Sequence, residues 1–323
     1  MTATAQSSHK VGPLRHFLRR HGAGYAFAGP YLAGLVLLLA GPLVLSLAMS
    51  FCDWDGMGGL DRIHSVGVRH YAELWREFTT GVNSNGEPSF ARLAVVNTLI
   101  YAAASVPLGL LAALGLALLL NRRLPGMGLF RTIFYLPAVV SGVATVLMWQ
   151  WMFHPELGLV NSFLRGLGVN TAGHPVLRWL YSPEGCKPAL IIMSLWTVGG
   201  AMLIFLAALQ NVSDSLYEAA RVDGAGRWRQ FWHVTLPQIS PAVFFNLVIG
   251  LIQAMQVFMQ PFLVYSPQQD NRLLMAVPQI YYEAFQLGHF GYASALAWLL
   301  LGLILLLTLG LLWSSRKWVY YES

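Results

Sequence analysis

Six long apolar stretches, each free of Asp, Glu, Lys, Arg and His, decide what this chain can fold into. They run from Tyr25 to Phe51, Leu93 to Leu120, Ile133 to Phe153, Pro188 to Gln210, Pro241 to Tyr265 and Gly291 to Trp313. A helix needs about twenty apolar residues to cross the hydrocarbon core of a bilayer, and each stretch reaches that length. The sequence therefore predicts an all-α polytopic membrane protein with six transmembrane helices.

Composition supports the same class. Hydrophobic residues make up 56% of the 323 residues and charged residues only 11%, whereas soluble domains carry about a quarter charged residues. The first apolar run is too long for a signal-peptide core and lacks a cleavage site of small residues, so we expect it to be retained. We predict a polar tail over residues 1–24, a membrane domain over 25–313 and a second tail over 314–323.

Basic residues indicate which ends of the spans face the cytoplasm, because Lys and Arg accumulate in short cytoplasmic loops. With the N-terminus inside, the cytoplasmic segments hold twelve of the 20 basic residues, and the outer loops hold ten of the 14 acids. We therefore expect both termini to be cytoplasmic. The net charge of +6 reflects this orientation and gives no support for a nucleic-acid partner.

A polar, helix-prone loop over residues 211–240 separates the fourth and fifth stretches. Ser213 or Asp214 can cap a helix that begins near Ser215, and Gly224 and Gly226 then break it.

A second amphipathic piece of this loop runs from Trp228 to Val234, and we expect Pro237 to end it. An ordinary interfacial helix is the alternative interpretation, since the aromatic residues of this piece would also suit the lipid headgroups.

The same loop resembles the EAA loop of bacterial ABC importer permeases. Glu218-Ala219-Ala220, Gly224 and Leu236-Pro237 match that pattern in order and spacing, although Val234 stands where the family usually has Ile. The resemblance implies a cytoplasmic coupling loop that passes motion from a separate ATPase subunit into the membrane. The coupling residues that it implies are Glu218, Ala219, Ala220, Asp223, Gly224, Leu236 and Pro237.

The resemblance extends over about residues 25–323, in which the chain is similar to the first permease subunit of maltose and glycerol-phosphate systems. It includes Asn97-Thr98, Phe130 to Pro137, Trp149 to Phe153, Gly158 to Asn161, His289 to Ala293 and Trp318 to Glu322. It implies a bacterial inner-membrane protein that works with a second permease, two ATPase subunits and an external solute-binding protein, and whose substrate is a carbohydrate. ATP and Mg²⁺ would bind to the ATPase subunits. This chain has no G-x-x-x-x-G-K-[ST] loop, so we expect it to bind no cofactor.

The fifth stretch carries a polar stripe that we interpret as part of the substrate pathway. Asn246, Gln253, Gln256 and Gln260 fall within one arc of a helix that turns about 100° per residue. Amides in hydrocarbon need hydrogen-bond partners, and they can donate to and accept from sugar hydroxyls. The alternative is that they hold neighbouring helices together. Pro261 is expected to kink the helix at Gln260.

Weaker pathway candidates lie on the third stretch, namely Ser141, Thr145 and Trp149.

A stand-alone ion-coupled carrier or channel remains an alternative function, but coupled carriers usually place an ionisable residue in the spans. A membrane-embedded enzyme would need buried titratable pairs or metal ligands, and the six stretches contain neither.

Cys52 and Cys186 fall at outer ends of spans, where a disulfide is permitted but not required. Short loop helices are expected at Tyr71 to Phe78 and Leu159 to Leu167.

Overall fold

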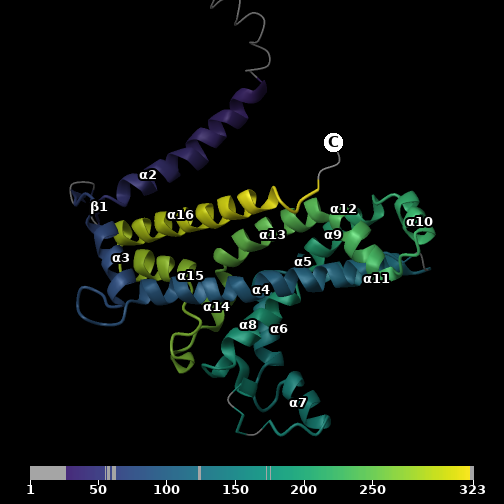
Figure 1. The fold of residues 1–323 in the computed structure, drawn as a ribbon. Coiled ribbons are helices and arrows are strands. Elements are labelled where there is room, and N and C mark those ends of the chain that lie inside the picture. Colours follow the sequence, from purple (N-terminus) through teal and green to yellow (C-terminus); the bar gives the residue numbers. More distant parts are fainter. Residues whose placement is uncertain are drawn as a thin grey trace, which may run out of the picture.

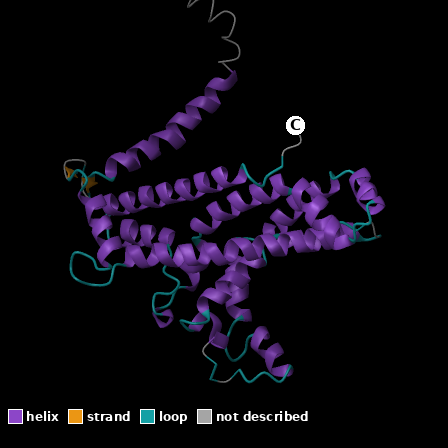
Figure 2. Ribbon diagram, in the orientation of Figure 1, coloured by secondary structure: helices purple, strands orange, loops and turns teal. Residues whose placement is uncertain are grey.

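Helices joined by loops make up most of the described chain in the computed structural model (Figure 2). The structure describes residues 27–320 except 55, 57, 58, 60–62, 123, 124, 172 and 175. The expected tail over 1–24 and the last three residues of the second tail lie outside the described residues. Two short strands, β1 (Cys52–Asp53) and β2 (His64–Ser65), pair antiparallel just after the first helix.

Four helices are long and apolar enough to cross a membrane, and two bent pairs bring the number to six among the described residues. The four are Phe27–Met49, which contains η1 (Leu35–Ala40) and α2 (Gly41–Met49), α4 (Phe90–Leu120), Ser240–Val264 and α16 (Phe290–Ser315). The bent pairs are α5 (Met127–Val139) with α6 (Gly142–Met152), and α8 (Cys186–Leu195) with α9 (Gly199–Gln210). The predicted all-α membrane fold is confirmed.

The third predicted stretch is not one straight helix, because α5 and α6 meet at 98°. Pro137 has no N–H, so the carbonyl of Ile133 cannot receive its helical hydrogen bond. Three residues later, Val140 adopts an extended conformation with φ −69° and ψ 141°, and the chain leaves the helix. The fourth stretch bends less, by 45°. Neither bend was visible in the hydropathy pattern.

The fifth stretch also breaks, between α13 (Ser240–Met255) and α14 (Met259–Val264). The predicted kink at Gln260 is wrong by about one turn: non-helical dihedral angles occur at Gln256 and Phe258. The cause is still Pro261, since the hydrogen bond that it cannot make is the one to Val257, four residues earlier. Pro261 itself lies in the first turn of α14, where a missing N–H does no harm.

The long helix α4 is the centre of the body, and it packs against α8, α9, α13 and α15 (Ala276–Tyr281) (Figure 1). Ala113 and Ala117 are fully buried on α4, where they form a core cluster with Phe205 and Ile239. Such small residues let neighbouring helices approach closely. A larger core cluster surrounds the other half of α4.

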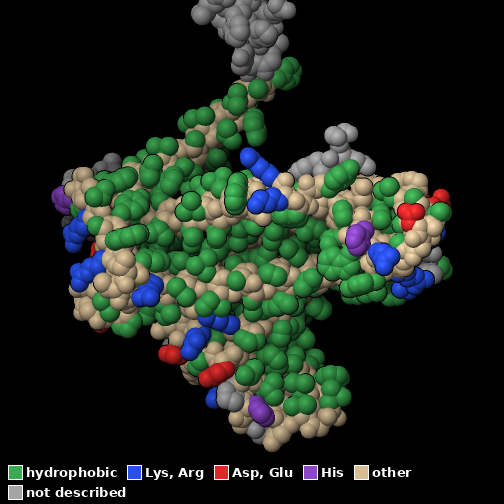
Figure 3. Space-filling model, viewed as in Figure 1, with side chains coloured by type: hydrophobic (Ala, Val, Ile, Leu, Met, Phe, Trp, Pro, Cys, Tyr) green, Lys and Arg blue, Asp and Glu red, His purple; other side chains and the backbone are tan. Residues whose placement is uncertain are grey.

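The first helix diverges from this body toward its N-terminus, and its last part, α2, contacts α16 (Figure 1). None of the residues in its most apolar window is buried, although Trp298 Nε1 on α16 donates a hydrogen bond of 3.0 Å to Ser46 Oγ. Hydrophobic side chains cover the visible middle of the long helices, and charged side chains gather mostly toward the helix ends (Figure 3). This distribution fits helices whose middles lie in lipid.

Both expected loop helices are present. The first is α3 (Arg69–Thr80) and the second is α7 (Leu159–Gly166). The other connections contain the short elements η3 (Val176–Tyr181), η5 (Pro267–Gln269) and η6 (Tyr282–Gln286). Cys52 and Cys186 are free thiols, so the permitted disulfide is not formed.

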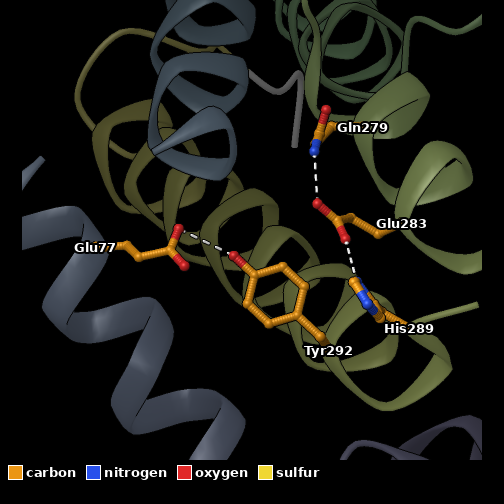
Figure 4. A network of polar contacts seen from close by, with 5 residues as sticks. All are labelled: Glu77, Gln279, Glu283, His289 and Tyr292. Carbon is orange, nitrogen blue, oxygen red and sulfur yellow. Dashed lines mark hydrogen bonds and ion pairs between the residues drawn. The ribbon is translucent and has the colours of Figure 1, made fainter. Parts of the chain in front are cut away.

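A buried carboxylate, Glu77, ties α3 to α16 (Figure 4) and, through Ser89, to the start of α4. Glu77 is only 4% exposed, and its Oε2 accepts hydrogen bonds from Ser89 Oγ and, at 3.0 Å, from Tyr292 OH. Ser89 also caps α4 by accepting from the N–H of Arg92 at 3.1 Å. One carboxylate thus connects three helices.

A second carboxylate lies nearby on η6 (Figure 4). Glu283 accepts a hydrogen bond of 2.8 Å from Gln279 Nε2 and pairs with His289 Nδ1 at 3.0 Å. These contacts join η6 to the last turn of α15 and to the start of α16.

We expect Glu77→Gln to flatten the dependence of thermal stability on pH. Burial raises the pKa of Glu77, and the carboxylates of Glu73 and Glu283 raise it further, while hydrogen bonds from Ser89 and Tyr292 lower it. Since the net shift is upward, the folded state still holds the Glu77 proton at pH values between 4.5 and the raised pKa, where the unfolded state has released it. The contribution of this proton to folding stability is complete below the ordinary pKa of 4.5 and is lost as pH rises through the raised pKa.

The measurement is the Tm of the purified protein between about pH 4 and 8. As pH rises across this window, the Tm of the wild type should fall by more than the Tm of Glu77→Gln. Glu87→Gln, on an exposed turn, is the matched control and should follow the wild type. Identical slopes for all three proteins would contradict the prediction.

Candidate functional site

The loop over 211–240 folds as two helical pieces joined by a tight turn. The first piece, α10 (Asp214–Val222), begins after Ser213, whose Oγ accepts a hydrogen bond from the N–H of Ser215. It ends at Gly224, whose φ of 74° favours glycine. The N–H of Ala225 then donates to the carbonyl of Ala220 at 2.8 Å. The predicted cap and glycine break are confirmed.

The second piece runs through α11 (Arg227–Gln230), η4 (Phe231–Thr235) and α12 (Leu236–Gln238). Pro237 does not end it, contrary to expectation, because the helical segment continues to Gln238. The turn before Pro237 is a π turn, in which the N–H of Leu236 bonds to the carbonyl of Phe231, and such a local adjustment accommodates a proline. The two pieces are held together by Tyr217 OH and Thr235 Oγ1, which are 3.0 Å apart.

The residues expected to dock an ATPase subunit are accessible on this loop. Four are exposed, namely Glu218, Ala219, Asp223 and Gly224, and three are half-buried, namely Ala220, Leu236 and Pro237. Two apolar side chains of the loop also face outward: Val222 is 89% exposed and Trp228 is 74% exposed. Exposed apolar side chains of this kind offer a surface that another protein can cover.

A cavity of about 720 Å³ lies beside the broken helices. Its wall combines one face of α4 with residues from the bent pairs and from the break between α13 and α14. All four predicted amides, Asn246, Gln253, Gln256 and Gln260, line this cavity. The structure therefore brings the stripe to a single hollow, with the last two amides at the helix break.

The polar groups of the cavity wall are amides and hydroxyls, and its described residues include no charged side chain. The polar residues are Tyr101, Ser105, Ser194, Thr197, Asn246, Gln253, Gln256 and Gln260. Asn246 is 5% exposed, and its Nδ2 has no hydrogen-bond partner among the described residues. An unpaired buried amide is unfavourable by about 1–3 kcal/mol. A solute hydroxyl that reaches Asn246 would remove that penalty.

The sequence did not reveal four of these wall residues. Tyr101 and Ser105 lie one turn apart on the cavity face of α4, a spacing that could have been recognised. Ser194 and Thr197 flank the bend between α8 and α9, which no sequence signal indicated.

The weaker candidates on the third stretch lie elsewhere. Ser141 is an exposed residue that precedes α6, and Thr145 is buried. Trp149 packs against Phe153 and Trp196, with ring centroids 4.8 and 5.9 Å apart. None of the three lines the cavity, so the geometry gives them no direct contact with a solute there.

Asn97 has a bracing role near the same wall, one turn before Tyr101 on α4. Its Nδ2 donates to the carbonyls of Asn271 and Leu274, each at 3.0 Å, and its Oδ1 accepts from Lys187 Nζ at 2.8 Å. Thr98 Oγ1 accepts from the N–H of Ala276 at 2.9 Å. These bonds hold α8 and the segment before α15 against α4.

A glycine sets the distance between the two bent pairs. A Cβ at Gly199 would lie 2.5 Å from the carbonyl oxygen of Phe134 and 2.8 Å from Tyr135 Cα. Only a residue without a side chain lets α9 approach the backbone of α5 this closely. The cavity wall next to this contact therefore depends on Gly199.

Residues 105–319, more than half of the chain, match the family described as "Binding-protein-dependent transport system inner membrane component". The chain belongs to this family. The resemblance inferred from the loop residues is thereby confirmed, and a stand-alone carrier or channel is set aside. The permease is a multi-pass component of the inner membrane, as its apolar helices indicate.

Two relatives show how far the likeness extends. The permease is 35% identical over 305 residues to "Probable ABC transporter permease protein YesP" of Bacillus subtilis (strain 168), with 93% of each chain covered. It is 30% identical over 302 residues to "Lactose transport system permease protein LacF" of Rhizobium radiobacter, with 91% of this chain and 94% of the relative covered.

A solved structure is similar across the whole fold. A chain of a bacterial alginate ABC transporter, crystallised with an alginate pentasaccharide-bound periplasmic protein, superimposes on the permease with a TM-score of 0.77. The two are 26% identical, and the match covers 94% of the permease and 97% of that chain.

We expect Gly199→Ala to destabilise the permease by about 1–3 kcal/mol, because the new methyl group collides with backbone atoms that cannot move independently. Gly200→Ala is the matched control, since a Cβ there meets nothing within 4 Å. It should be neutral or stabilising by up to about 1 kcal/mol through helix propensity. The Tm of each purified variant measures the effect. A higher Tm for Gly199→Ala would contradict the close contact.

Proposed function

We propose that this permease translocates a carbohydrate, delivered by an extracytoplasmic solute-binding protein, through the amide-lined cavity. The observation that carries the proposal is the stripe of Asn246, Gln253, Gln256 and Gln260 on one wall of that cavity. Amides and hydroxyls suit a neutral polyhydroxylated solute, because each can donate to and accept from its hydroxyl groups. The lactose and alginate transporters named above support the substrate class.

The energy source in this proposal is a separate pair of ATPase subunits that bind ATP and Mg²⁺, while a second permease completes the membrane path. The permease itself has no phosphate-binding loop of the Walker type and is not an enzyme in this scheme. Exposure of Glu218 and Ala219 on α10 supports docking of that helix to an ATPase subunit.

The orientation in this proposal places both termini, and the loop with α10, in the cytoplasm. Three predicted cytoplasmic segments lie near one another, namely the connection between α4 and α5, the coupling loop and the C-terminal tail. Their proximity supports this orientation. Arg131 Nη2 donates to the carbonyl of Leu120 at 3.1 Å, beside the connection between α4 and α5. The N–H of Tyr320 donates to Ser240 Oγ at 2.8 Å, beside the end of the coupling loop. The proposed division is a tail over 1–24, a membrane domain over 25–313 and a tail over 314–323.

In this proposal, alternating access results from movement of the coupling loop. Movement of α10 would reach α13 through α11, η4 and α12, since these elements are continuous with it. Because α13 carries Asn246 and Gln253, such movement would change the side from which the stripe can be reached.

The coupling role predicts that Glu218→Lys and Gly224→Asp abolish solute uptake but leave the permease inserted. The first change reverses a charge on the exposed face of α10. The second places a side chain at a φ of 74°, where L-residues are strained. Uptake into proteoliposomes that contain the whole complex, normalised to permease content, measures the effect.

Asp214→Asn, at the start of α10 and outside the predicted docking residues, is a suitable control and should retain uptake. Normal uptake by both Glu218→Lys and Gly224→Asp would show that this loop does not couple ATP hydrolysis to transport.

The pathway role predicts that Gln256→Leu and Gln260→Leu weaken the apparent affinity for the solute. Each change removes hydrogen-bonding groups at similar volume, and losing one bond to a neutral partner is worth about 0.5–1.5 kcal/mol, roughly twofold to tenfold in affinity. Apparent affinity comes from the concentration dependence of uptake by the reconstituted complex.

Val248→Leu, on the opposite side of α13 from Gly250 and outside the cavity lining, is the control and should leave affinity unchanged. If the Gln variants instead disassemble the complex and leave affinity unchanged in the remainder, the stripe serves helix packing.

A further inference from the structure

The hydroxyl of Ser240 joins two backbone groups from distant parts of the chain. Ser240 Oγ donates to the carbonyl of Pro237 at 2.6 Å, and it accepts from the N–H of Tyr320 at 2.8 Å. Ser240 is only 4% exposed. It therefore connects the last residues of the coupling loop, the start of α13 and the C-terminal tail through one buried oxygen.

The tail continues from α16 and follows α13. The N–H groups of Trp318 and Val319 donate to the carbonyl of Ser315 at 3.1 and 2.9 Å, which fixes the tail to the end of α16. The ring of Trp318 then lies across Phe244, with centroids 6.0 Å apart and planes at 72°. Phe244 is one turn beyond Ser240 on the same face of α13.

The coupling loop reaches Ser240 through a buried, hydrogen-bonded connection. Ile239, directly before Ser240, is fully buried in the core cluster that contains Ala113 and Ala117 of α4. The N–H of Ile239 donates to the carbonyl of Thr235 at 3.0 Å, and Thr235 in turn contacts Tyr217 of α10. A displacement of α10 would therefore reach the residue next to Ser240.

We propose that Ser240 is a positioning residue that passes movement of the coupling loop to the sixth span through the C-terminal tail, as well as to the fifth span directly. The inference rests on the proposed function, because it assumes that the loop is moved by an ATPase subunit. Covalent continuity moves α13 with the loop. The loop is not continuous with α16, although α16 packs on α13. The Ser240 hydroxyl adds a direct hydrogen-bonded link between the end of the loop and the tail that follows α16.

Four variants separate this role from simple packing. Ser240→Ala removes the hydroxyl, whereas Ser240→Thr keeps it. Tyr320→Pro removes the backbone N–H that reaches Ser240, whereas Tyr320→Ala keeps that N–H and loses only a side chain that is 54% exposed. The complete transporter is purified with each variant and reconstituted with its solute-binding protein.

The readout is the ratio of solute transported to ATP hydrolysed, measured with the basal ATP hydrolysis and the yield of assembled complex. Ser240→Ala and Tyr320→Pro should lower the ratio about threefold or more, with basal hydrolysis and yield near those of the wild type. Ser240→Thr and Tyr320→Ala should keep the wild-type ratio.

An unchanged ratio in Ser240→Ala and Tyr320→Pro would overturn the proposal. A loss of yield with a normal ratio in the assembled remainder would also overturn it, since Ser240 would then only stabilise the fold. If Ser240→Ala does not assemble, the pair at Tyr320 decides, because that residue lies outside the core. Absence of solute-dependent uptake by the wild-type complex would instead contradict the proposed function itself.

Discussion

The need to satisfy every backbone hydrogen bond in hydrocarbon is the constraint on which the rest of this structure depends. Each break in a spanning helix releases N–H and C=O groups that lipid cannot pair. Two of the breaks, between α8 and α9 and between α13 and α14, border the cavity, and Ala138 brings α5 to the same wall. The helix breaks and the cavity therefore occur together, since irregular backbone in the hydrocarbon region is tolerated only where it lines an aqueous hollow or is covered by protein.

Much of this fold could be predicted because lipid imposes a simple rule on sequence. The spans, the stripe on the fifth span and the capped helix after Ser213 all follow from local spacing of polar and apolar residues. The bends could not be predicted in the same way. Pro137 and Pro261 are visible in the sequence, but a proline does not by itself fix the size of a bend such as the 98° angle between α5 and α6. The wall residues Ser194 and Thr197 were missed because their exposure to the cavity results from such a bend.

The helix α4 gives this broken structure a continuous element. It is a single helix of 31 residues, although it contains Pro107. Near its start, Asn97 and Thr98 hold the segment before α15, and at its end the carbonyl of Leu120 accepts from Arg131. Elements at both ends of the body are therefore fixed to the same helix, while α5 with α6, α8 with α9 and α13 with α14 supply the changes of direction around it.

The uncharged wall of the cavity has an electrical consequence. Moving one elementary charge across a membrane involves about 2.3 kcal/mol for each 100 mV of potential. The described lining residues carry amide and hydroxyl groups and no ionisable Lys, Arg, Asp, Glu or His side chain. Rearrangement of this wall around a neutral solute therefore displaces no full charge through the field. In the proposed transport of a neutral solute, polarised and depolarised cells would therefore meet the same barrier at this step.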